Sequence, residues 1–138
     1  MQNLWEKVVG EIKSFDVDSF AERELRLADK EGVRILTLES PECFSLLKSI
    51  YDPPPILYVQ GKALDTISLS LAVLGTRRPS EYGKLIAERL CLKLATAWFS
   101  VIIGLARGID TLAHKAALSA GADTIAVFGC GLGHTYQP

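Results

Sequence analysis

Apolar and polar positions alternate in two different ways along the chain. Residues 4–50 carry apolar side chains at helical spacing in three short pieces. The run at 52–55 cannot be helical, because proline lacks an amide donor and restricts the residue before it to extended backbone. From residue 69 onward, continuous apolar runs alternate with amphipathic segments. We therefore predict a small helical domain over residues 1–50 and a second domain over residues 51–138.

The first domain contains its own start and stop signals. Asp18 or Ser19 is predicted to cap the second helix, and Gly32 to end it. Residues 33–38 then form a short extended segment. Pro41 is tolerated in a first helical turn, so a third helix is predicted to open there.

The second domain repeats a strand, a turn and a helix. A short strand at 56–60 precedes three buried strands, each followed by glycine, at 69–74, 100–103 and 124–128. Helical patterns begin at Ser80 and near Ile109, and the second ends at Gly121. Strands that are apolar on both faces and alternate with helices indicate a parallel sheet with right-handed crossovers. The predicted fold class is α/β, a Rossmann-like parallel sheet that forms an incomplete doubly wound domain, because no crossover follows the third strand.

The net charge of the chain does not attract a polyanion, so any polyanion site must be a local cluster of basic residues. The chain is 49% hydrophobic and 22% charged, as in packed globular domains, and its formal net charge is -1. Residues 1–50 carry seven basic and ten acidic side chains, whereas residues 72–115 carry seven basic and three acidic ones. The basic surplus coincides with glycine-rich turns. Arg89 and Lys93 suit a solvated helix face, whereas Arg77, Arg78, Arg107 and Lys115 are candidates for phosphate contact.

The cysteines and the apolar stretches suggest a cytoplasmic protein. The three cysteines are far apart and match no metal-binding spacing, so reduced thiols in a cytosol are the simplest interpretation. The longest apolar stretch, 97–106, is about half a membrane span. We therefore predict no membrane association and no export.

The candidate chemistry lies beyond the carboxyl ends of the predicted strands, where open parallel sheets bind ligands. In the first turn, Gly75 is expected to permit close approach of a ligand, Thr76 offers a hydroxyl, and Arg77 can grip a phosphate with two hydrogen bonds. Ser80 and Pro79 suit a helix cap and a helix start.

The second turn brackets an arginine with two glycines just before a helix. Gly104 and Gly108 flank Arg107, so amides and a guanidinium are expected to point the same way and bind an anion. Asp110 can cap the helix or pair with Arg107, and capping is favoured. His114, one turn later, is expected to be structural.

The sequence lacks the motifs of several enzyme classes. The third turn, 129–133, lacks the dinucleotide fingerprint, the P-loop pattern is absent, and no nucleophile, base and acid combination stands out. Tyr136 is a candidate either for base stacking or for packing. We predict no catalytic residue, cofactor or metal.

The ordered motifs resemble the DprA/Smf family. They stand at Leu57–Gly61, Gly75–Arg77, Ser80–Gly83, Gly104–Asp110 and Thr124–Leu132. The resemblance implies a bacterial cytoplasmic protein that binds single-stranded DNA, protects incoming DNA during natural transformation and loads the RecA recombinase. It implies DNA contact by Arg77 and a pocket at Gly75, Thr76, Gly104, Arg107 and Gly108. Arg78 and Lys115 complete the predicted DNA-binding set.

Departures from the family pattern keep two alternatives open. Ile103 replaces a small serine, and Trp98 stands where glycine is common. After Leu132 the chain reads Gly133 to Pro138 instead of the family's Asp-x-x-Tyr-Pro. We therefore expect the second half of the family's domain, the expected homodimer surface, to be missing. The alternatives are a nucleoside-monophosphate phosphoribohydrolase, whose Pro-Gly-Gly-x-Gly-Thr segment is missing, and a truncated fragment without function.

Overall fold

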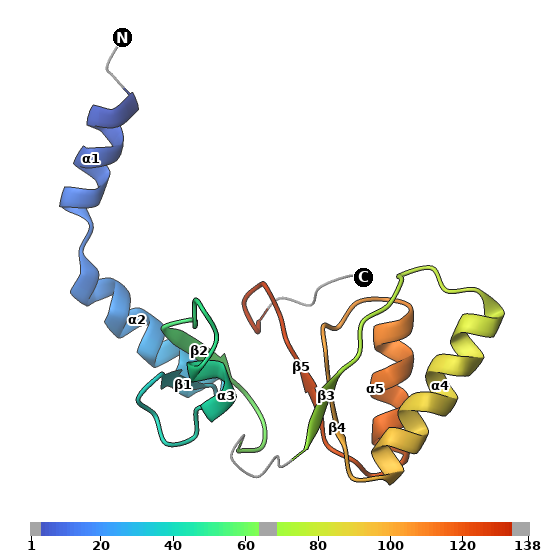
Figure 1. Cartoon of the computed structure of the whole chain (residues 1–138). Coiled ribbons are helices and arrows are strands. Elements are labelled where there is room, and N and C mark those ends of the chain that lie inside the picture. The colour runs from blue at the N-terminus through green and yellow to red at the C-terminus, as the bar shows by residue number, and fades with distance from the viewer. Residues whose placement is uncertain (1–3, 64–68, 134–138) are drawn as a thin grey trace. The chain divides into compact units, whose positions relative to one another are not determined.

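The computed structural model describes residues 4–63 and 69–133 and divides the chain into two compact units (Figure 1). The first unit comprises the chain up to Ser40 together with Ser45–Lys62, and the second comprises Pro41–Phe44 together with the chain from Ala63 onward. Residues 51–62 thus group with the first unit, whereas the sequence assigns them to the second domain. Strand pairing explains this grouping, because β2 (Ile56–Val59) pairs antiparallel with β1 (Arg34–Thr37).

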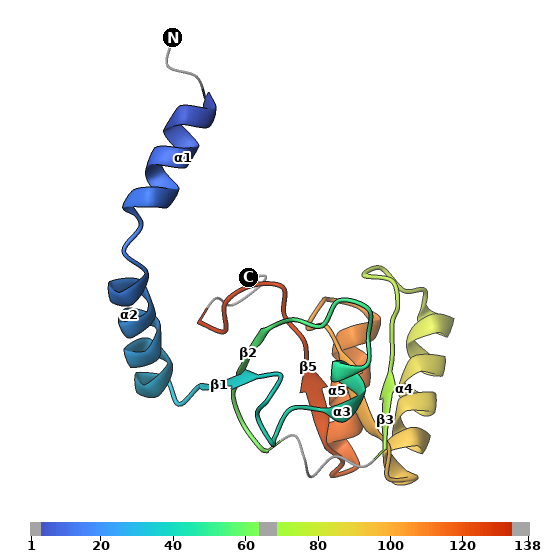
Figure 2. The same cartoon turned by 60° about the vertical axis from the view of Figure 1, so that its left-hand side comes forward.

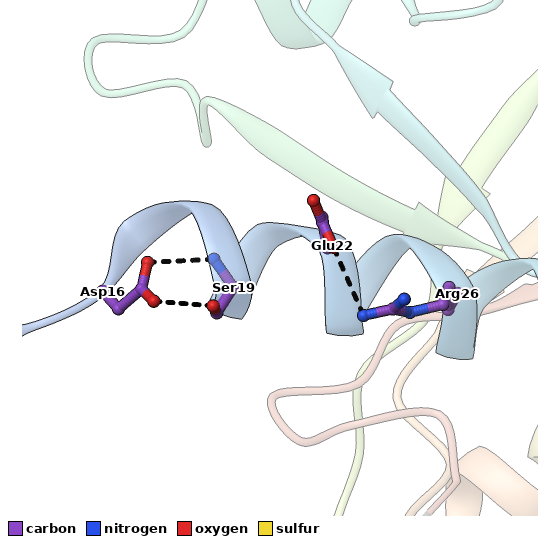
Figure 3. Close-up of polar contacts among 4 residues, drawn as sticks. All are labelled: Asp16, Ser19, Glu22 and Arg26. Carbon is purple, nitrogen blue, oxygen red and sulfur yellow. Dashed lines mark hydrogen bonds and ion pairs between the residues drawn. The ribbon is translucent and has the colours of Figure 1, made fainter.

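Helices α1 (Leu4–Ser14) and α2 (Val17–Lys30) open the first unit. The cap of α2 is Asp16, so the prediction of Asp18 or Ser19 is wrong. The Asp16 carboxylate accepts hydrogen bonds from the Ser19 amide at 3.1 Å and the Ser19 hydroxyl at 2.6 Å (Figure 3). These hydrogen bonds stabilise the ionised form and lower the pKa of Asp16.

The end of α2 leads directly into the strand pair. Gly32 ends the helix in the left-handed region, with φ of 63°, as the sequence predicts. The Gln60 side-chain amide, just beyond β2, donates to the Glu31 carbonyl at 2.9 Å. The third helix, α3 (Ser45–Lys48), begins later than Pro41 and spans 4 residues.

The second unit is a Rossmann-like α/β layer, as predicted. Its three strands are parallel in the order β3-β4-β5 and alternate with two helices. Along the chain the elements are β3 (Ser70–Ala72), α4 (Glu81–Thr96), β4 (Ser100–Ile103), α5 (Ile109–Ser119) and β5 (Thr124–Ala126). Both helices lie on the same face of the sheet (Figures 1 and 2), as successive right-handed crossovers in one direction require. Ser80 caps α4, accepting from the Gly83 amide at 3.1 Å.

The core lies between this sheet face and the two helices. Val101 and Ile103 of β4 are 0% and 2% exposed and pack against small side chains of the helices, namely Cys91, Ala95, Ala113, Ala116 and Ala117. Small side chains allow the helices to approach the strand closely. Burial raises the pKa of the Cys91 thiol.

Among residues 41–44, 63 and 69–133, no helix of this unit covers the opposite face of the sheet. Ala72, Ile102 and Ile125 are register neighbours and lie on that face. All three residues of β3 are exposed, so the prediction of burial on both faces is wrong for this strand. The outer position of β3 and the uncovered face explain the difference.

Across residues 4–63 and 69–133, no helix combines the length and the apolar character that a membrane crossing needs.

Candidate nucleic-acid interface

Two turns meet at the carboxyl edge of the three-stranded sheet. One connects β3 to α4 and contains Thr76, Arg77 and Arg78, and the other connects β4 to α5 and contains Arg107 and Gly108. All three arginines are exposed. The parallel order of β3 and β4 brings both turns to the same edge, as the sequence predicts.

A backbone hydrogen bond joins the two turns. The amide of Ile109, the first residue of α5, donates to the Thr76 carbonyl at 3.2 Å. Gly108 has φ of 91° and lies so close to the Thr76 carbonyl and the Arg77 backbone that a Cβ would come within 3 Å of both. Only glycine adopts this backbone without strain and leaves room for the close approach. The position of the Arg77 backbone therefore depends on Gly108.

Gly75 has a packing role. A Cβ there would collide with the side chain of Ile109, again at less than 3 Å. The side of Gly75 where a Cβ would stand is thus occupied by a side chain of the protein. The contribution of Ile109 was missed in the sequence, although its place directly after Gly108 was the available signal.

Internal hydrogen bonds order each turn. The Thr76 hydroxyl accepts from the Arg78 amide at 3.2 Å, so it shapes its own turn before any ligand arrives. In the other turn the Thr111 hydroxyl donates to the Ala106 carbonyl at 2.8 Å. Both turns are therefore preorganised, which lowers the entropic cost of binding.

Lys115 lies away from these turns. It lines a groove between α4 and α5 together with Glu88, Arg89, Leu92, Leu112, Ala116 and Ser119. The structure thus brings Arg77, Arg78 and Arg107 to one edge, and it places Lys115 beside Arg89 in the groove.

His114 is held from both sides of its ring. Nδ1 lies 2.7 Å from the Thr124 hydroxyl and Nε2 lies 3.1 Å from the Gly104 carbonyl. Since a carbonyl only accepts, Nε2 carries a proton. The ring ties α5 to β5 and to the turn that follows β4, in agreement with the structural role expected for this buried histidine.

Asp110 does not act as the predicted cap. The N-cap position of α5 is Gly108, and no side chain caps that end. Asp110 is 7% exposed, and within residues 4–63 and 69–133 its carboxylate has no hydrogen bond or ion pair. The alternative ion pair with Arg107 is not formed either.

The remaining predicted features lie at the margin of the described chain. Gly129, Gly131 and Gly133 follow β5, with Cys130 exposed between the first two. Tyr136 lies outside the described residues. In the parts of the chain that the structure describes, no three His, Cys, Asp or Glu side chains gather as a metal cluster.

Comparison with known proteins identifies related chains. The model of the family described as DNA recombination-mediator protein A matches residues 34–138. The DNA processing protein DprA of Bacillus subtilis strain 168 is 33% identical over 115 residues, which cover 83% of this chain and 39% of that protein. Protein Smf of Escherichia coli K12 is 46% identical over 87 residues, which cover 63% of this chain and 23% of that protein. The matches thus span well under half of these relatives' length.

Two solved structures have the same fold. The crystal structure of DprA from Streptococcus pneumoniae has a TM-score of 0.69 and 31% identity, covering 98% of this chain and 50% of that one. A structure that addresses the single-stranded DNA binding mode of DNA processing protein A from Helicobacter pylori has a TM-score of 0.62 and 33% identity. The latter match covers 75% of this chain and 46% of that one.

Proposed function

The chain belongs to the DNA recombination-mediator protein A family, which includes the DprA/Smf proteins, and from this premise we propose that it binds single-stranded DNA through the two joined turns. The observation that supports this most directly is the close approach of Gly108 to the Arg77 backbone, which holds Arg77 next to the turn that carries Arg107. The Helicobacter pylori relative, described by its single-stranded DNA binding mode, supports the choice of ligand.

Phosphate recognition is the physical basis of the proposal. Arginine presents a planar fork of donors that matches a phosphate oxygen pair. Three exposed arginines on two preorganised turns give a local positive surface on a chain whose formal net charge is only -1. Binding is then driven by neutralisation of phosphates and release of their counterions, so it weakens as salt rises.

Arg77→Ala tests the proposal. Removal of a charge-assisted hydrogen bond costs about 1.5 kcal/mol of binding free energy, or roughly a tenfold rise in Kd. The slope of log K against log salt becomes shallower by about 0.7 for each phosphate that the variant no longer neutralises. Fluorescence anisotropy of a labelled oligodeoxythymidylate, measured at several NaCl concentrations, gives both quantities.

Arg26→Ala is the matched control, because it removes the same side chain from the other unit. Arg26 pairs with Glu22 at 3.4 Å (Figure 3), and the two side chains are 74% and 69% exposed, so this pair contributes little to stability. The control should keep wild-type affinity and salt slope. If Arg77→Ala also keeps both, the two turns are not the DNA site.

The proposal extends to properties of the whole protein. These are loading of RecA, a role in natural transformation, homodimer formation and a cytoplasmic location. RecA loading is checked by following RecA filament growth on oligonucleotides coated with single-strand binding protein, with and without this protein. We expect faster nucleation with the wild type than with Arg77→Ala.

We propose a binding protein without a chemical step of its own. Incubation of the purified protein with nucleoside monophosphates, followed by chromatography for free bases, checks this directly. Release of a base that scales with protein concentration would favour the phosphoribohydrolase alternative.

A further inference from the structure

Strand β3 forms one edge of the three-stranded sheet, and among the residues that the structure describes its outer side pairs with no strand. The Leu69 carbonyl accepts a hydrogen bond from β4 at 2.8 Å, and the Val73 amide donates one to β4 at 3.1 Å. Backbone groups of alternate residues in a strand point to opposite sides. Ser70 and Ala72 therefore direct their amide and carbonyl groups away from β4, toward the open edge.

This edge lacks the features that usually protect an exposed strand. Residues 69–74 contain no charged residue and no proline. All three residues of β3 are exposed, and the flanking Leu69 and Leu74 are 52% and 84% exposed. Natural sheets commonly place Lys, Pro or a covering segment at such an edge, because unpaired amides and carbonyls bind a further strand. The outer side of β3 is therefore suited to strand addition.

The edge at the other side of the sheet is less suited to this. The three residues of β5 are only partly exposed, and the charged Asp123 directly precedes the strand. The Thr124 hydroxyl is already engaged, since it donates to the Val101 carbonyl at 2.9 Å. A charge at a strand is one of the features that disfavour addition of another chain. Strand addition is thus expected at β3.

The open groups of β3 are complementary to those of an identical strand. In an antiparallel pair, directly opposed residues exchange two backbone hydrogen bonds. With a two-fold axis at Ala72, this residue faces Ala72 of the second copy, and Ser70 faces Leu74 of the second copy, whose backbone groups also point outward by the same alternation. The small Ala72 side chain leaves room at the axis, and no like charges oppose each other in residues 69–74.

We propose that β3 pairs antiparallel with β3 of a second copy of this chain, about a two-fold axis at Ala72, and joins the two sheets into one. The pairing is isologous, so it closes at two copies. It gives the homodimer of the proposed function a surface within this chain, and to that extent it rests on the proposed function. It does not depend on DNA binding.

Helix α4 extends this surface. The two-fold axis of an antiparallel strand pair is perpendicular to the sheet, so α4 of both copies lies on the same side of the joined sheet. Ile86 and Leu90 are 41% and 53% exposed. They precede the groove residues Glu88 and Leu92 by two positions, about 200° around the helix, so they lie on the flank away from α5. This apolar flank is available for contact across the axis.

Sedimentation equilibrium of the full chain at several concentrations tests the proposal. One chain has a mass of 15.1 kDa, and we expect a species of twice this mass and none larger. Ala72→Lys should raise the dimer Kd by roughly tenfold, because two ammonium groups then oppose each other across the axis. Leu118→Lys is the matched control. It adds the same charge at a 64% exposed position of α5 and should keep the wild-type dimer Kd.

Oxidative cross-linking tests the register and guards against misfolding of Ala72→Lys. A Cys130→Ser background removes the exposed native thiol. In it, Ala72→Cys should give a disulfide-linked dimer, because opposed Cα atoms lie about 5.5 Å apart in such a pair, within disulfide reach. Ser70→Cys is the control and should give none, because its counterpart lies about 14 Å away along the strand. Copper phenanthroline in air is the oxidant, and a non-reducing gel shows the product.

Each contrary outcome has its own meaning. A wild type that stays monomeric overturns the proposal and assigns the edge of β3 to a strand from outside this sequence. A dimer that survives Ala72→Lys and is not linked through Ala72→Cys overturns the β3 surface, while homodimer formation stands. Species that grow in mass with concentration overturn the closed two-fold pairing. Arg77→Ala should dimerise as the wild type does, so loss of DNA binding is measured separately from loss of the dimer.

Discussion

The residue at which the chain leaves a helix is a glycine in two helices of this protein and a tryptophan in a third. Gly32 after α2 and Gly121 after α5 have φ of 63° and 70°, and Trp98 after α4 has φ of 66°. In each case this residue and the next donate their amides back into the last turn. Those bonds are Gly32 to Asp29, Val33 to Ala28, Gly121 to Leu118, Ala122 to Ala117, Trp98 to Ala95 and Phe99 to Leu94. This is the Schellman pattern, whose left-handed position favours glycine.

Trp98→Gly should therefore stabilise the protein. A left-handed conformation costs a residue with a Cβ roughly 1–2 kcal/mol, and the added flexibility of glycine in the unfolded chain offsets roughly 0.5–1 kcal/mol of that gain. Trp98 is 87% exposed, so its indole contributes little packing. We expect the free energy of unfolding in urea to rise by about 0.5–1 kcal/mol.

Trp98→Ala is the control, because it removes the indole but keeps the Cβ. It should show no gain in stability. Equal stability of the glycine and alanine variants would mean that the indole, and not the backbone conformation, sets the cost at this position.

At the scale of elements, the site consists of two turns that fit each other. The Ile109 amide binds the Thr76 carbonyl at 3.2 Å, the Ile109 side chain fills the space over Gly75, and Gly108 lies against the Arg77 backbone. The sequence places these turns at one sheet edge, because parallel strands end there. The sequence does not reveal that Gly75 packs against the turn that begins α5, or that Gly108 packs against the turn before α4. Those contacts depend on how the two helices are placed relative to each other.

Gly108→Ala should lower both stability and oligonucleotide affinity. Its φ of 91° is unfavourable for alanine, and the added methyl group collides with the Thr76 carbonyl and the Arg77 backbone. Strain of this kind costs about 1–3 kcal/mol. Relief of the collision moves the Arg77 turn, so the anisotropy assay should show weaker binding although Gly108 itself is uncharged.

Gly121→Ala separates the two effects. Gly121 also has a positive φ, of 70°, but its added methyl group meets nothing within 4 Å, and it lies at the other end of α5. This variant should lose about 1 kcal/mol of stability and keep the wild-type Kd. A parallel loss of affinity in both variants would trace the effect of Gly108→Ala to general destabilisation.

At the scale of the whole molecule, the chain is two compact units of different build. The first holds an antiparallel strand pair with helices, and the second holds the parallel sheet with its core under α4 and α5. The three cysteines differ in their exposure to solvent. Cys43 and Cys91 are 6% and 0% exposed, whereas Cys130 is exposed beyond β5.

Thiol labelling should therefore count one cysteine in the native protein and three in denaturant. Burial keeps Cys91 from reagent and raises its pKa, which lowers the fraction of reactive thiolate. Absorbance after addition of dithionitrobenzoate measures the count. Cys130→Ser should abolish the rapid reaction, and a persisting rapid phase would show that a buried cysteine opens readily.

The sequence by itself determined the elements that depend on local chemistry. Gly32, Gly121 and Ser80 end or begin helices as predicted, because caps act within a few residues of backbone. The order of apolar runs indicated a parallel α/β layer, since buried strands and amphipathic helices differ in period. The ordered glycine motifs indicated the family, which the comparisons confirm.

Only the tertiary structure decided what each side chain meets. Asp16 rather than Asp18 caps α2, because its carboxylate reaches the Ser19 amide. Lys115 lies in the groove between α4 and α5, and β3 is exposed as an outer strand. Asp110, favoured as a cap, lies beside Gly104 with no partner for its carboxylate among residues 4–63 and 69–133. The Asp16 cap is a choice among neighbouring residues, whereas the positions of Lys115 and β3 depend on packing between elements, which local patterns do not encode.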